Sequence, residues 1–124
     1  MNLLLDTHAL LWWLADSPRL ASGARKAIAD ADAVHVSAAT AWEIGIKKSR
    51  GKLRFDGDLE EQLSLNGFRP LPITLRHAWT AAHLPTHHHD PFDRMLVAQT
   101  MMESLTLMTS DPAIEAYNIP LIRV

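Results

Sequence analysis

The chain opens with NLLLDTHALLWWLA at residues 2–15, and this stretch decides the fold class. Residues 2–5 are a short apolar run of the kind that forms a buried strand. The apolar side chains that follow recur at helical spacing, which predicts a helix over residues 7–15. A buried strand that leads directly into a helix is the repeating unit of parallel α/β proteins.

The same alternation continues through the whole chain. Further strands are predicted at 34–36, 68–73, 105–108 and 119–124. Further helices are predicted at 22–31, 38–48, 58–66, 74–84 and 90–102, and a short one opens at Asp111-Pro112. Pro70 and Pro72 assign the strand around them to a sheet edge. No linker, repeat or low-complexity segment interrupts the pattern, so we expect one α/β domain over residues 1–124.

Composition sets the class of protein. A length of 124 residues suits one domain, and 48% hydrophobic with 21% charged residues is typical of a globular protein. The lack of cysteine excludes disulfides and thiolate metal sites. The N-terminus does not resemble a signal peptide, and no run reaches the roughly 18 apolar residues of a membrane helix. We therefore expect a soluble protein of the cytoplasm with no membrane partner.

Acidic residues follow the predicted strands. Asp6 comes directly after the first strand, and Asp111 comes shortly after the strand at 105–108. Glu43 lies on the helix that follows the second strand, and Asp93 lies in the first turn of a later helix. Open parallel sheets bind ligands outside the carboxyl ends of their strands. We expect these four carboxylates to converge on that edge.

Four carboxylates at one place need a counter-ion, because like charges raise each other's pKa or move apart. Oxygen ligands without cysteine suit Mg²⁺ or Mn²⁺. Such a site can orient a water for in-line attack on a phosphodiester and stabilise the leaving oxygen. The acids therefore indicate metal-dependent phosphodiester chemistry.

Each acid also has a structural interpretation. Asp111 and Asp90 both precede a proline, as helix N-caps often do, and for Asp90 we favour that role. Asp6 could simply cap the first helix. Glu43 could form an exposed ion pair with Lys47, four residues further on. The shared location of the acids, rather than any one of them, supports the metal site.

A cationic run lies between residues 47 and 54. Lys47, Lys48 and Arg50 belong to it, and the run could follow an RNA backbone or be a solvated helix end. The net charge of −2 argues weakly against a nucleic-acid partner. Arg94 could pair with an acid instead of RNA.

Histidine and tryptophan leave further alternatives open. We interpret residues 87–89, three adjacent histidines, as a polar loop or a group near substrate rather than a zinc site, because neighbouring side chains point in different directions. His8 is expected to pack or to position other groups. Most of the four tryptophans are expected in the core, although a stripe with Leu11 and Trp12 could be an exposed partner surface.

Four segments together resemble one family. They are LLLDTHALLWWL (3–14), VSAATAWEIGIKKSRGKL (36–53), HHDPFDRMLVAQ (88–99) and LMTSDPAI (107–114). In content, order and spacing they resemble the PIN domains of VapC-like toxins over nearly the whole chain. The resemblance implies a three-layer α/β/α fold with a mainly parallel central sheet. It also implies an endoribonuclease that uses Mg²⁺ or Mn²⁺ in a bacterial or archaeal toxin–antitoxin system.

The resemblance also implies roles for single residues. Asp6, Glu43, Asp93 and Asp111 match the catalytic, metal-binding acids, of which the fourth varies most in role within the family. Thr7 and Ser110 match hydroxyls near the metal. The family implies a cognate antitoxin that covers a groove, for which Leu11 and Trp12 are candidate contacts, and it implies a homodimer.

Two rival functions stay open. A PIN-like module could bind RNA or protein without cutting, although the acid set is intact. A phosphatase could use Asp6 as its nucleophile, but such enzymes commonly carry a second aspartate two residues later, where this chain has His8.

Overall fold

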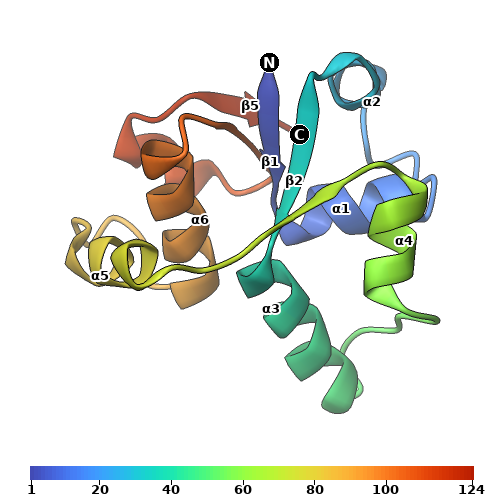
Figure 1. Ribbon diagram of the computed structural model, residues 1–124, viewed down its shortest axis with the longest axis horizontal. Helices are drawn as coiled ribbons and strands as arrows, with labels where there is room; N and C mark the ends of the chain where they lie inside the picture. The colour runs from blue at the N-terminus through green and yellow to red at the C-terminus, as the bar shows by residue number, and fades with distance from the viewer.

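The computed structural model describes residues 1–124 and contains a five-stranded sheet. Helices lie on both sides of the sheet (Figure 1). The strands are β1 (Asn2–Leu5), β2 (Ala33–Ser37), β3 (Arg69–Leu71), β4 (Thr106–Thr109) and β5 (Leu121–Arg123). The helices are α1 (Thr7–Leu14), α2 (Ser22–Asp30), α3 (Ala38–Ser49), α4 (Leu59–Leu65), α5 (Leu75–His83) and α6 (Pro91–Met102), with a 3₁₀ helix, η1 (Pro112–Tyr117). The predicted alternation of strands and helices is confirmed.

The sheet is parallel throughout and has the order β3-β2-β1-β4-β5. From β1 the chain moves outward to β2 and β3, and it then returns to place β4 on the other side of β1. The direction of winding therefore reverses between β1 and β4. In open α/β sheets this reversal leaves a crevice at the carboxyl ends of the two strands, where ligands bind.

Alternation along β1 divides the core into two layers. Leu3 and Leu5 pack into a cluster with residues of α1, α2 and α4, whereas Leu4 packs into a second cluster with α6 and η1. Figure 1 accordingly shows α1, α2 and α4 on one side of the strands and α5 and α6 on the other. The three-layer α/β/α arrangement is confirmed. Leu3, Leu4 and Leu5 are fully buried in the central strand of the sheet, and each contributes about 1.5–3 kcal/mol to folding.

Most predicted boundaries differ from the structure by one or two residues. β3 is an edge strand, as Pro70 within it and Pro72 just after it indicated. The tryptophan prediction was wrong. Trp42 and Trp79 are 67% and 69% exposed, and Trp12 and Trp13 are half-buried. Helical spacing tells which side chains share a face, but it does not tell which face another element covers. None of the helices is both long and apolar enough to span a membrane.

Candidate functional site

Asp6 lies at the reversal point of the sheet and bridges two strand ends. As the N-cap of α1, its Oδ1 accepts a hydrogen bond from the Ala9 amide at 2.8 Å. Its Oδ2 accepts one from the Ser110 amide, just after β4, at 2.9 Å. Asp6 is 4% exposed. The capping role and a role in the site are therefore compatible, because the same bonds that start the helix hold the carboxylate at the crevice.

Glu43 on α3 faces the same crevice. Its carboxylate accepts hydrogen bonds from the Thr7 hydroxyl at 2.5 Å and from Lys47 Nζ at 2.6 Å. The expected i, i+4 ion pair with Lys47 is present, but the expectation that it is exposed was wrong, since Glu43 is buried. The hydrogen bond to Glu43 raises the pKa of Lys47 above its usual value. Lys47 thus balances charge inside the site.

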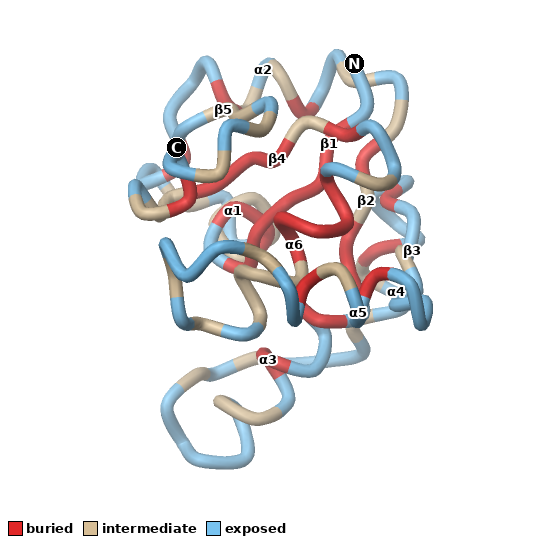
Figure 2. The backbone as a smooth tube through the Cα atoms, turned by 90° about the vertical axis from the view of Figure 1, so that its left-hand side faces the viewer, coloured by how far each residue is buried: buried red, intermediate tan, exposed pale blue.

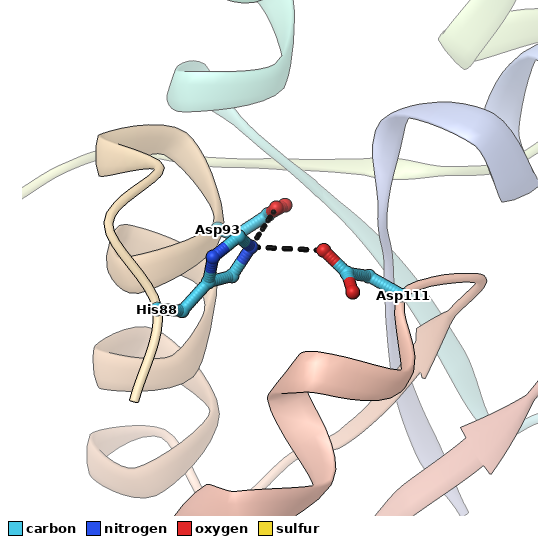
Figure 3. A group of neighbouring side chains, drawn as sticks. All are labelled: His88, Asp93 and Asp111. Carbon is cyan, nitrogen blue, oxygen red and sulfur yellow. Dashed lines mark hydrogen bonds and ion pairs between the residues drawn. The ribbon is translucent and has the colours of Figure 1, made fainter. Parts of the chain in front are cut away.

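His88, Asp93 and Asp111 form a compact group (Figure 3). His88 Nε2 lies 2.8 Å from Oδ2 of Asp93 and 2.8 Å from Oδ2 of Asp111. Asp93 lies in the first turn of α6, and Asp111 caps η1 through its other oxygen, which accepts from the Ala113 amide. One nitrogen and two oxygens that could hold a metal ion lie within 4.8 Å of one another. These are donor types that divalent ions accept.

The charges in this group are not balanced. Burial, together with the neighbouring Asp90 and Asp6, raises the pKa of Asp93 to about 6, although the hydrogen bond to His88 acts in the opposite direction. Burial alone would lower the pKa of His88, but Asp93, Asp111 and Asp90 outweigh burial and raise it. Neighbouring carboxylates contribute to the rise in both pKa values, which indicates an excess of negative charge. A bound cation would relieve that excess, so the residues present fit a divalent ion.

All these groups line one polar cavity of about 350 Å³. Its lining residues, none of them hydrophobic, are Asp6, Thr7, His8, Glu43, Lys47, His88, Asp90, Asp93, Ser110, Asp111 and Pro112. The structure thus brings the four expected acids, Thr7, Ser110 and Lys47 together. Lys48 and Arg50 do not line the cavity. Lys48 lies in the last turn of α3 and Arg50 caps its C-terminus, at the exposed end that projects from the body of the molecule in Figure 2.

A second cavity of about 620 Å³ adjoins the first. Leu11 and Trp12 line it, together with Leu53, Phe55 and other residues of α1 and the segment after α3. His8 belongs to both cavities: its ring stacks on Trp12, and its Nδ1 lies 3.0 Å from the Ser110 hydroxyl. This groove, in which half of the lining residues are hydrophobic, therefore adjoins the acidic site at His8.

Sequence reasoning did not single out His88, and it assigned Asp90 to capping alone. Asp90 does cap α6, by accepting from the amides of Phe92 and Asp93, but it also lines the cavity. The signal for His88 was its position in the loop before the Asp-Pro cap, which brings it over the first turn of the helix. His87 and His89 are exposed, so only the middle histidine of the three is directed at the acids.

Arg94 pairs with no acid, and the expectation that it could do so was wrong. Its guanidinium donates to the carbonyl oxygens of Ala81, Leu84, Pro85 and His88 and to the Tyr117 hydroxyl. The loop before α6 presents carbonyl oxygens to Arg94 rather than a carboxylate. The five N–H donors of a guanidinium can bond to several carbonyl oxygens at once. Arg94 therefore holds the loop before α6.

The fold and the site define a parallel α/β protein with an acidic pocket at the reversal point of its sheet. The family model of the PIN domain matches residues 3–119, and the chain belongs to this family. Over 122 residues the chain is 29% identical to Ribonuclease VapC22 of Mycobacterium tuberculosis. This match covers 96% of the present chain and 94% of that protein.

Solved structures have the same fold. Crystal structures of VapBC2 from Rickettsia felis bound to a promoter DNA fragment and of FitAcB from Neisseria gonorrhoeae each match with a TM-score of 0.70. The first is 16% identical and covers 99% of this chain and 98% of that chain. The Neisseria gonorrhoeae structure is 22% identical in sequence, and its match covers 98% of this chain and 96% of that chain. The expected PIN-type, VapC-like architecture is confirmed.

Proposed function

We propose that the protein is a metal-dependent endoribonuclease of the VapC toxin type, which cuts RNA phosphodiester bonds and is neutralised by a cognate antitoxin. One observation carries the proposal. Five carboxylates and His88 surround one polar cavity at the sheet reversal point, in a chain similar over nearly its whole length to a protein named a ribonuclease. The PIN domain then extends over residues 1–124. Because cellular RNA is its substrate, the cytoplasm is its place of action.

We assign Asp6, Glu43, Asp93 and Asp111 as the catalytic and metal-binding residues. Asp93 and Asp111 each have a carboxylate oxygen directed at the centre of the group. Asp6 and Glu43 are held by hydrogen bonds and supply negative charge beside them. Mg²⁺ or Mn²⁺, when bound, supplies a Lewis acid that orients water and stabilises charge on the leaving oxygen.

Other residues of the chain act on these acids or on the RNA. Thr7 fixes the Glu43 carboxylate through its hydroxyl, and Ser110 fixes Asp6 through its amide. Lys47, Lys48 and Arg50 place cations at the C-terminal end of α3, which extends from the site, and cations attract the phosphate backbone. We assign Lys48 and Arg50 to RNA steering, and Lys47 to both RNA and Glu43.

The groove beside the site is where we place the antitoxin. Leu11 and Trp12 are partly exposed there, although α1 packs its other side against the core. A helical or extended segment that filled this groove would lie next to His8 and could block the acidic cavity. Similar structures include toxin–antitoxin complexes, among them one from Klebsiella pneumoniae. We also propose a homodimer, which is consistent with Leu75 and Trp79 being 88% and 69% exposed on α5.

The decisive experiment is cleavage of total cellular RNA by the purified protein, with Mg²⁺ or Mn²⁺ against EDTA. Discrete cuts should require the metal and should disappear in Asp6→Asn. Asp30→Asn is the matched control, because Asp30 pairs with Lys26 on the surface of α2 and should leave cleavage unchanged. RNA that is bound but never cut would show a silent binding module instead. Full cleavage by a folded Asp6→Asn protein would refute the assigned site.

A further inference from the structure

His88 reaches the site from the loop before α6. Its Nε2 lies between Asp93 and Asp111, at 2.8 Å from an oxygen of each, and the side chain is only 19% exposed. Figure 3 shows the ring directed between the two carboxylates. The imidazole therefore occupies the place where the two acids would share a cation.

The tautomer of His88 follows from its other nitrogen. The His89 amide donates a hydrogen bond to Nδ1 of His88 at 3.1 Å, so Nδ1 is an acceptor and the ring proton lies on Nε2. Histidine ligands of metals have the opposite arrangement, with a lone pair toward the metal and the second nitrogen donating to an acceptor. His88 is thus arranged as a hydrogen-bond donor toward the acids.

The backbone that carries His88 is held on both sides of the residue. The His88 amide donates to the Tyr117 hydroxyl at 3.0 Å, and the His88 carbonyl accepts from Arg94 at 3.1 Å. Tyr117 and Arg94 also hold the carbonyl of Pro85, at 2.8 and 3.0 Å. These bonds use the main chain, so they fix the loop whatever side chain stands at position 88. The donor is therefore preorganised, as groups that bind a reacting phosphate need to be.

We propose that His88 is a substrate-binding residue whose Nε2–H donates to Asp93, with Asp111 alongside, in the free protein and passes to a phosphate oxygen of RNA when a cation takes those carboxylates. One N–H cannot fully satisfy two carboxylates, so a divalent cation displaces it. The freed N–H then faces a cavity with no hydrophobic lining, and an anionic phosphate oxygen is the strong acceptor that fits there. This inference rests on the proposed nuclease function.

The test compares metal binding with cleavage in the full chain. Mn²⁺ affinity is measured from the free-ion EPR signal, and bound Mn²⁺ is examined for coupling to a directly bonded nitrogen. Cleavage of RNA is measured at saturating Mn²⁺ as kcat and KM. The variants are His88→Ala, His88→Gln, which keeps an N–H donor, and His89→Ala, which removes an exposed neighbour. Thermal unfolding checks that each variant is folded.

We expect His88→Ala to bind Mn²⁺ at least as tightly as the wild type, because it lacks the competing donor. Its kcat should fall about 10²-fold, the usual loss when one donor to a reacting oxygen is removed. His88→Gln should recover part of that loss, and His89→Ala should behave as the wild type. No nitrogen coupling should appear on bound Mn²⁺.

Two results would overturn the proposal while the nuclease function stands. One is a tenfold or greater loss of Mn²⁺ affinity in His88→Ala together with nitrogen coupling in the wild type, which would make His88 a ligand. The other is unchanged cleavage by His88→Ala. A wild-type protein that shows no metal-dependent cleavage would overturn the nuclease function and this inference together.

Discussion

Asp93→Asn should stabilise the metal-free protein at neutral pH. Burial and the neighbouring acids raise the pKa of Asp93 from 3.8 to about 6 in the folded state. A carboxyl whose pKa is raised by folding stabilises the fold while it is protonated, below about pH 4, and this stabilisation is lost as the pH rises through about 6. The wild-type protein therefore loses stability across that range. Asparagine is neutral at every pH and should avoid the loss.

The size of the effect follows from the pKa. A rise of about two pKa units is worth about 3 kcal/mol at pH above 6. The value of about 6 already includes the opposing effect of the hydrogen bond to His88, so loss of that bond is not counted again. Loss of a negative charge from the first turn of α6 costs about 0.3–1 kcal/mol, and relaxation of the partly solvated site reduces the gain further. We expect a net gain of about 1–2 kcal/mol, or a rise in Tm of roughly 3–8 °C for a chain of this size.

The assay is thermal unfolding in EDTA from pH 4 to pH 8. Asp93→Asn should match the wild type near pH 4 and exceed it above pH 6, whereas Asp30→Asn should differ little at any pH. Added Mn²⁺ should reverse the order, because a ligand stabilises only the protein that binds it. An Asp93→Asn protein that is less stable at pH 7.5 in EDTA, or a difference that does not change with pH, would refute the reasoning.

Three further predictions concern neighbours of the site. Thr7→Val removes the 2.5 Å hydrogen bond to Glu43 and should lower the free energy of unfolding in urea by about 1–3 kcal/mol. It should also slow single-turnover cleavage of RNA, and an unchanged cleavage rate would show that Thr7 has no role in the reaction. Arg94→Lys cannot satisfy four carbonyls, so amide hydrogen exchange in residues 84–89 should become faster while the core stays protected. Unchanged exchange in residues 84–89 would contradict the role of Arg94 in holding this loop. Lys48→Glu with Arg50→Glu should raise KM for RNA and weaken its salt dependence without changing Tm, and an unaltered KM at low salt would exclude these cations from RNA steering.

Helix starts were predictable because their causes are local. Asp6, Ser37, Asp58, Thr74 and Asp90 each cap the following helix through an amide two or three residues away. Such bonds depend on short-range geometry, so a reader of the sequence can recognise them. The apolar runs between the caps predicted the strands in the same way, and the rule for parallel sheets then placed the acids at one edge.

Long-range contacts were not predictable from the same signals. Arg94 meets carbonyls of a loop and the hydroxyl of Tyr117, 23 residues further on, although its charge suggested an acid as partner. Most of the four tryptophans were expected in the core, yet Trp42 is 67% exposed and makes an edge contact with Phe92. Each outcome depends on how elements pack, which the spacing of residues within one element does not specify.

The sequence by itself determined the class of fold, the helix caps and the edge of the sheet that carries the acids, because these depend on hydrogen bonds and periodicities within a few residues. Tertiary structure alone decided that β4 returns beside β1, that Glu43 turns inward to Thr7, and that His88 stands between Asp93 and Asp111. Those contacts join side chains from separate elements. Their geometry exists only after the two core layers have packed around β1.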